Sequence, residues 1–107
     1  MHLISAKALA DASLRFPQYA DELLQLGKTI EKGYFSDALA MRRIFPSLDN
    51  LKYLDKHYVI DIAGNHLRLI ALIFFARQKF YVRHIYTHRE YDDFVARCRT
   101  KGKSPWM

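Results

Sequence analysis

The sequence contains few residues that crosslink a chain, break its regular structure or anchor it in a membrane. Of its 107 residues, one is cysteine, three are proline and four are glycine. The single cysteine, Cys98, excludes an internal disulfide and any metal site built from several cysteines. The longest apolar run, residues 69–76, has 8 residues, whereas a helix needs roughly 20 to cross a bilayer. The N-terminus shows no signal-peptide pattern, so we expect a cytoplasmic protein without a membrane segment.

Familiar motifs of catalysis and metal binding are also missing. The sequence has no HEXXH, no pair of CXXC motifs, no GXGXXG and no Walker loop. His84 and His88 are four residues apart, but the strand expected there ends between them, which disfavours a zinc site. We therefore expect neither a metal ion nor a cofactor.

Hydrophobic residues make up 50% of the chain, which is enough for one domain with a real core. Residues 57–63 alternate in the manner of a strand, and the Gly-Asn pair at 64–65 suits a tight hairpin turn. Residues 66–75 form the returning strand, which is almost wholly apolar from Leu69 to Phe75, as in a central strand covered on both faces, with Arg68 as the exception. A polar turn then leads to a third strand over residues 80–87, so the sequence predicts three consecutive antiparallel strands.

Two helices are expected before these strands. The first covers residues 6–15, with Ser5 as its N-cap. The second begins at Pro17 and ends at Gly33, which we expect in the left-handed conformation of a helix end. With almost no loop between them, the two helices form a hairpin whose apolar side covers the sheet.

The segment between the helices and the strands, residues 34–55, carries the weakest signals. Residues 41–45 resemble a short edge strand that Pro46 would stop, and residues 51–54 resemble a further extended segment.

After the third strand, Thr87 and Glu90 match a capping box and open a final helix. Cys98 falls on the apolar stripe of this helix, so we expect it to be a buried core residue and not a nucleophile. The domain should cover residues 1–98, followed by a basic and mobile tail, residues 99–107. The predicted fold class is α+β, with an N-terminal helical hairpin packed on a small twisted antiparallel sheet and a short C-terminal helix.

The net positive charge comes from one half of the chain. Residues 1–50 hold 6 basic and 6 acidic residues, whereas residues 51–107 hold 11 basic and 5 acidic residues, which accounts for the formal charge of +6. Aromatic residues are interleaved with these charges, as is typical of proteins that bind single-stranded nucleic acid. A surface that merely keeps the protein in solution is the alternative interpretation.

Arginine, lysine, histidine and tyrosine at neighbouring strand ends suit one reaction in particular, metal-free RNA cleavage. In this reaction the 2′-hydroxyl attacks the adjacent phosphodiester, which requires a base, an acid and cations close to the phosphorane. Histidine and tyrosine can transfer protons, and the arginine fork matches phosphate oxygens.

The order of the elements, together with LDKHYVIDIAGNHLRLIALIFF and YVRHIYTHREYD, resembles the HigB toxins of bacterial toxin-antitoxin pairs, within the RelE-like superfamily. The resemblance covers nearly the whole chain and is most specific over residues 45–92. It implies a small α+β endoribonuclease that cleaves mRNA in the ribosomal A site. It also implies a HigA-type helix-turn-helix antitoxin as partner. A non-catalytic protein that blocks translation by occupying RNA or the ribosome is the alternative.

The same resemblance suggests positions for the active residues. An arginine on the central strand corresponds to Arg68, and residues just after the last strand correspond to His88, Arg89 and Tyr91. Other HigB proteins use a lysine or histidine on an earlier strand together with Asp, Tyr and His near the C-terminus; no histidine follows Tyr91 and Asp92 here. The candidate catalytic residues are therefore Lys56, His57, Arg68, Arg83, His88, Arg89 and Tyr91.

Structural roles are open for some of these residues. Arg68 can pair with Asp61 across the hairpin, and Tyr91 lies on the apolar stripe of its helix. Strict alternation along the third strand would place Arg83 on the face opposite His84. Further basic residues are candidates for contacts with RNA: Lys52, Arg77, Lys79, Arg99 and Lys101.

Overall fold

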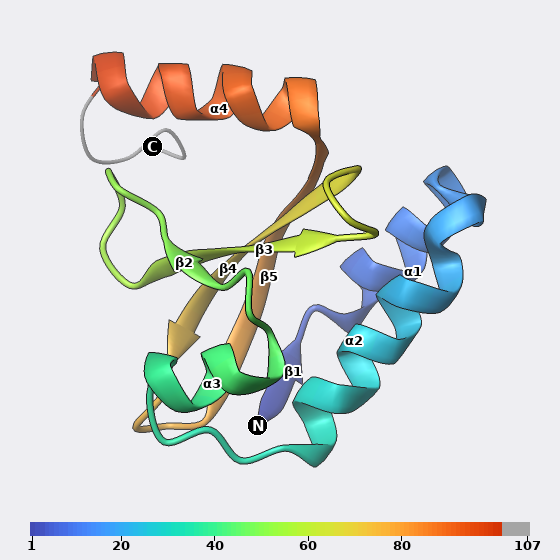
Figure 1. Cartoon of the computed structure of the whole chain (residues 1–107), viewed down its shortest axis with the longest axis vertical. Coiled ribbons are helices and arrows are strands. Elements are labelled where there is room, and N and C mark those ends of the chain that lie inside the picture. The colour runs from blue at the N-terminus through green and yellow to red at the C-terminus, as the bar shows by residue number, and fades with distance from the viewer. Residues whose placement is uncertain (102–107) are drawn as a thin grey trace.

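The computed structural model describes residues 1–101 as a five-stranded sheet with helices on both faces (Figure 1). The strands are β1 (His2–Ile4), β2 (Asp49–Asn50), β3 (His57–Ile62), β4 (Leu67–Phe74) and β5 (Lys79–Thr87). The helices are α1 (Ala6–Arg15), a 3₁₀ turn (Pro17–Tyr19), α2 (Ala20–Lys32), α3 (Ala38–Ile44) and α4 (His88–Lys101). The α+β class and the three consecutive strands are confirmed.

The strands lie in the order β1-β5-β4-β3-β2. From β2 to β5 every pair is antiparallel, as the sequence predicts, but β1 runs parallel to β5. The sheet is therefore mixed. Sequence analysis missed β1 because three residues are too few to show a period of two.

Successive side chains of β4 point to opposite faces of the sheet, and each face has its own apolar cluster. Leu67, Leu69 and Ile73 belong to the main core, which α1 and α2 cover, and each is at most 2% exposed. Ile70 points to the other face and packs with Phe94 of α4 in a smaller cluster. Because both faces are covered, β4 reads as a continuous apolar run.

A β-bulge in β5 changes the expected face assignment. The register shifts between Ile70 and Ala71, which pair with His84 and Val82, so Arg83 is the extra residue. Before the bulge Val82 faces the main core, and after it His84 contacts the ring of Phe94 on the opposite face. A bulge reverses the alternation, and the sequence carries no periodic signal for it.

Residues 34–55 fold differently from the expectation. Residues 41–45 do not form an edge strand, because α3 covers most of them, and residues 51–54 lie in turns. The helix begins after Asp37, whose carboxylate accepts a hydrogen bond from the Ala40 backbone N–H at 2.8 Å. The edge strand is instead the two-residue β2.

The expected helix ends also need correction. Ser5 makes no side-chain cap to α1, and Pro17 opens the 3₁₀ turn, so that α2 begins at Ala20. Gly33 has φ −90°, outside the left-handed region. Packing requires this glycine, since a Cβ there would lie 2.5 Å from the ring of Phe35.

The capping box at the start of α4 is confirmed. The Thr87 hydroxyl accepts from the Glu90 backbone N–H at 3.2 Å, and the Glu90 carboxylate accepts from the Thr87 backbone N–H at 2.9 Å. Cys98 is fully buried, as expected. The helix runs to Lys101, so the first three residues of the expected tail are helical, and the remainder lies outside the described residues. No helix within residues 1–101 has the length and apolar character needed to cross a membrane.

Replacing the unforeseen cap tests the placement of α3. Asp37→Ala should lower the free energy of unfolding by about 1 kcal/mol, because one backbone donor of the first helical turn loses its acceptor. Asp37→Asn retains an acceptor oxygen and should stay close to the parent. Urea unfolding of the three proteins measures both effects, and equal stability of all three would contradict the capped helix.

Candidate functional site

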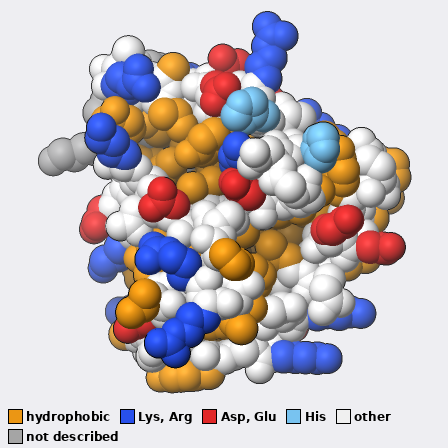
Figure 2. All heavy atoms as spheres, in the orientation of Figure 1, with side chains coloured by type: hydrophobic (Ala, Val, Ile, Leu, Met, Phe, Trp, Pro, Cys, Tyr) orange, Lys and Arg blue, Asp and Glu red, His pale blue; other side chains and the backbone are white. Residues whose placement is uncertain are grey.

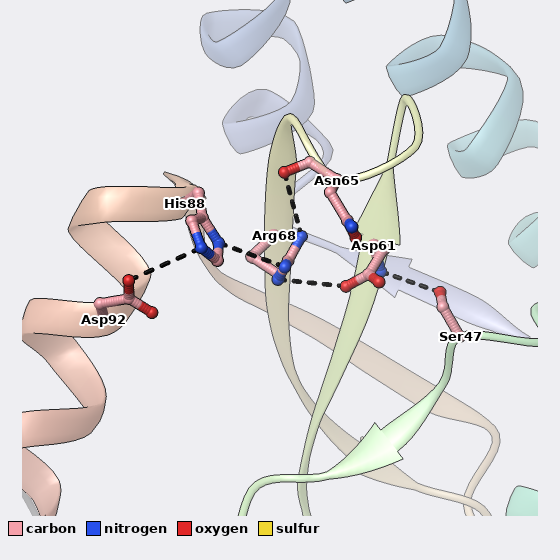
Figure 3. A network of polar contacts seen from close by, with 6 residues as sticks. All are labelled: Ser47, Asp61, Asn65, Arg68, His88 and Asp92. Atoms are coloured by element: carbon pink, nitrogen blue, oxygen red, sulfur yellow. Dashed lines mark hydrogen bonds and ion pairs between the residues drawn. The ribbon is translucent and has the colours of Figure 1, made fainter.

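Arg68 lies at the centre of a polar network where β4 begins (Figure 3). Its Nε is 3.2 Å from Asp61 Oδ1 on β3, directly across the hairpin. Its Nη1 donates to the Asn65 backbone carbonyl at 3.2 Å, and its Nη2 lies 3.3 Å from His88 Nδ1. The Arg68 side chain is only 11% exposed. A buried guanidinium requires such partners, so the pairing with Asp61 considered from the sequence is present.

The contact with Arg68 determines the protonation pattern of His88. A guanidinium nitrogen can only donate, so Nδ1 must accept and the ring proton of neutral His88 lies on Nε2. Nε2 faces Asp92 Oδ2 at 3.7 Å, one helical turn further along α4. The His88 and Asp92 side chains are 63% and 62% exposed, so substrate can reach the imidazole.

Tyr91 completes this side of the network. The Arg68 guanidinium carbon lies 5.6 Å from the centre of the Tyr91 ring. Burial raises the pKa of the Tyr91 hydroxyl, although the charge of Arg68 acts in the opposite direction. The hydroxyl therefore keeps its proton at neutral pH and can donate a hydrogen bond. Its position on the apolar stripe of α4 is also confirmed, since the ring packs against the smaller cluster.

Asp61 is itself fixed from two directions. Its backbone N–H donates to Ser47 Oγ at 2.9 Å. The Asn65 amide, turned so that its nitrogen faces the carboxylate, donates to Asp61 Oδ2 at 3.1 Å. A continuous chain of contacts thus runs from Ser47 to Asp92 (Figure 3). We define Asp61, Arg68, His88, Tyr91 and Asp92 as the Arg68 cluster.

Lys56 and His57 lie at the other end of the same sheet face. His57 pairs with Leu72, four residues along β3 from Asp61, or roughly 13 Å at the strand rise. His57 is 9% exposed, and its Nδ1 donates to the Asp55 carbonyl at 2.7 Å. Burial lowers its pKa, as does the charge of Arg83. The structure therefore brings neither Lys56 nor His57 into the Arg68 cluster.

Sequence analysis did not place His84 in the site. Its ring stacks on Tyr86, with 4.8 Å between centroids, and contacts Phe94. Burial lowers the pKa of His84 to about 4, and the charges of Arg83 and Arg97 contribute. The bulge at Arg83 is what turns His84 toward α4.

The remaining cations are spread around this face and do not join the Arg68 cluster. Arg83 is exposed at the bulge and lines a hollow beside α1 together with Arg15. Lys52 and Arg77 are exposed in loops, Lys79 is half-buried in β5, Arg89 and Arg99 are exposed on α4, and Lys101 ends that helix.

Arg97, which the sequence analysis did not select, lies over the ring of Phe94 at 5.9 Å. Figure 2 shows an apolar area beneath α4 with basic side chains along its outer edge and a histidine with acidic side chains at the other end. Within residues 1–101 no group of three or more His, Cys, Asp or Glu is arranged to hold a metal ion.

Comparison with known proteins decides the family. The model of the HigB toxin family, described as the RelE-like toxic component of a toxin-antitoxin system, matches residues 19–94. The mRNA interferase toxin HigB of Escherichia coli strain K12 is 56% identical over 103 residues, which cover 96% of this chain and 99% of that protein. An mRNA interferase HigB from Escherichia coli O6:H1 is 44% identical over 92 residues, which cover 86% of this chain and 89% of the relative.

The chain belongs to the HigB toxin family. The resemblance seen in the sequence is thereby confirmed. Within this HigB-family toxin, the Arg68 cluster combines an exposed imidazole, a guanidinium and a protonated phenol within one short stretch of sheet and helix. The catalytic and RNA-binding roles of individual residues stay predictions.

The imidazole at position 84 should make stability depend on pH. The folded pKa of about 4 lies below the ordinary histidine value of 6.5, so the unfolded chain binds a proton first as pH falls. Stability is then full above pH 6.5 and lost toward pH 4, by up to about 2 kcal/mol for this half-buried group. Burial lowers the pKa of His57 too, which acts in the same direction.

His84→Phe keeps an aromatic ring against Tyr86 and removes the titrating group. The variant should match the parent at pH 7 and lose less stability than the parent at pH 4.5, measured by urea unfolding. His66→Phe, at an exposed hairpin position where the ring stacks on Tyr19, is the matched control. An unchanged pH slope in His84→Phe would contradict the assignment.

Proposed function

We propose that this HigB-family toxin is a metal-independent mRNA interferase that cuts messages on the ribosome, with the Arg68 cluster as its catalytic centre. The observation that carries the proposal is the contact between Arg68 and the exposed His88 on a face bordered by basic side chains. The enzyme class is supported by relatives named mRNA interferases at 56% and 44% identity. Translation takes place in the cytoplasm, which is where the protein acts.

The network suggests how substrate switches on the base. At rest Arg68 donates toward His88 Nδ1 and covers its lone pair. A phosphate oxygen is a stronger acceptor for the guanidinium fork than a neutral ring nitrogen. When the scissile phosphate binds the Arg68 guanidinium in place of His88, the Nδ1 atom of His88 becomes available to accept a proton. The base is therefore freed where the phosphate is bound.

The reaction then proceeds by internal attack. His88 Nδ1 takes the proton of the 2′-hydroxyl while the 2′-oxygen bonds to phosphorus, and Asp92 beside Nε2 stabilises the imidazolium. Arg68 and the Tyr91 hydroxyl donate to the phosphorane oxygens as their charge grows. The bond to the 5′-oxygen breaks, and the leaving oxygen takes a proton from solvent. The products are a 2′,3′-cyclic phosphate and a 5′-hydroxyl end.

The ribosome supplies positioning that the cluster lacks. The Arg68 cluster contains one imidazole, that of His88, and no second imidazole to act as the acid. Holding the 2′-hydroxyl in line with phosphorus contributes much of the rate in such reactions. We therefore expect rapid cleavage of ribosome-bound message and slow cleavage of purified RNA. Mapping of 5′ ends after brief induction should show new ends within translated codons. A protein that blocks translation by occupancy alone would stop growth without new ends.

Arg68→Ala tests the catalytic centre. Loss of a preorganised donor should lower the cleavage rate about a hundredfold or more. The free energy of unfolding should fall by only about 1 kcal/mol, because Asp61 is 32% exposed and water replaces its partner. Arg43→Ala, which removes an exposed arginine of α3, is the matched control and should cleave normally. A variant that cleaves at the parental rate, or that fails to fold, would contradict this role for Arg68.

A HigA-type helix-turn-helix antitoxin is the proposed inhibitor. Since all the net charge lies in residues 51–107, an antitoxin that covers the basic face should be released more readily as salt rises. Dissociation of the purified complex between low and high salt measures this. A complex indifferent to salt would place the antitoxin on α1 and α2, with the Arg68 cluster open.

A further inference from the structure

A second hollow lies at the end of β4 remote from Arg68. It encloses about 410 Å³ and is lined by Lys56, Tyr58, Ile73, Phe74, Phe75, Ala76 and Arg77. This volume falls within the range of small-ligand sites. The lining of this hollow thus includes two basic residues and three aromatic residues.

Lys56 is held in place at the rim of this hollow. Its φ of 59° puts its backbone in the left-handed region, which is energetically unfavourable for a residue with a side chain such as lysine. Its carbonyl accepts from the Ile73 backbone N–H at 3.1 Å, which ties the loop before β3 to β4. Its ammonium lies 5.5 Å from the centre of the Phe74 ring. The fold thus places a cation beside an aromatic face at the cost of local strain.

A neighbouring hollow repeats the same pairing. It encloses about 710 Å³ and is lined by residues 50–58. Lys56 and Tyr58 line both this hollow and the one at the end of β4. In it the Lys52 ammonium lies 5.6 Å from the centre of the Tyr53 ring. The lining of each hollow therefore contains one ammonium close to an aromatic ring, and Lys56 lines both hollows. A single-stranded nucleic acid presents the complementary repeat of phosphate and base.

We propose that these two hollows bind consecutive nucleotides of the single-stranded message, several nucleotides away from the phosphate held by Arg68. One base stacks on Phe74, with Lys56 and Arg77 on its phosphates, and the adjacent nucleotide occupies the Lys52 and Tyr53 hollow. The inference rests on the proposed function for its substrate. It adds a subsite that fixes the register of the message along β4.

A binding experiment on the full chain tests the subsite without cleavage. In the Arg68→Ala background, a short single-stranded RNA carrying 2-aminopurine is titrated, with anisotropy reporting affinity and quenching reporting stacking. Phe74→Leu should weaken binding about fivefold or more and reduce the quenching, because stacking on an aromatic ring is lost. Phe74→Trp should retain both signals.

Charge is tested separately through the salt dependence. Lys56→Gly and Arg77→Gln should each lower the slope of log affinity against log salt by about 0.7, since one phosphate contact is lost from a single strand. Lys56→Gly also relieves the left-handed backbone strain, so this variant should unfold at a urea concentration no lower than that of the parent. Lys28→Gln removes an exposed lysine on α2, across the sheet, and should leave the slope unchanged.

The outcomes separate the two proposals. Unchanged quenching and affinity in Phe74→Leu, or an equal loss of slope in Lys28→Gln, would overturn the subsite and show that RNA is held by diffuse charge alone. New 5′ ends in cells would still support cleavage in that case. Conversely, if the subsite variants behave as expected but the parent protein produces no new 5′ ends in cells, the subsite would stand and the proposed cleavage activity would be contradicted.

Discussion

Burial of one guanidinium group is the constraint on which the arrangement of this face depends. Arg68 is the one charged residue of β4, a strand that is otherwise apolar. Its side chain is only 11% exposed, so its charge must be paired. Asp61 supplies the countercharge, and the hairpin register places it directly opposite. Ser47 and Asn65 then hold Asp61 and Arg68. A further donor of Arg68, Nη2, points to His88, so the same constraint orients the imidazole.

Strand patterning made much of this fold predictable, because the features that define it are local. The alternation in residues 57–63 and the capping box each rest on a few neighbouring residues, and both are found in the structure. The hairpin forms too, but not through a two-residue turn at Gly64-Asn65: its loop covers residues 63–66, with positive φ at Ala63 and Gly64. Gly33 and α3 were misjudged for a different reason. A collision with the ring of Phe35 and a cap by Asp37 depend on folded contacts that a periodic pattern does not show.

Several residues of the candidate site were selected from the sequence for the same reason. Arg68, His88 and Tyr91 lie in the two stretches on which the resemblance rests, and the structure brings them together. Lys56 and His57 belong to the same face but lie roughly 13 Å away along the strand. His84 was not placed against α4 because a single extra residue at Arg83 reverses the faces of β5. Bulges of this kind recur beside functional sites.

Stability and chemistry are distributed unequally between the two sheet faces. Within residues 1–101, eighteen buried residues form the core between the sheet and the helices α1 and α2, whereas five form the cluster between the sheet and α4. Local opening should therefore begin at α4, since the weakest apolar cluster sets the least stable unit. His88, Tyr91 and Asp92 all lie on that helix. The Glu90 cap and its pair with Arg15 of α1 tie the helix start to the larger core. The end of α4 that carries His88, Tyr91 and Asp92 is therefore anchored even where the rest of the helix is less well supported.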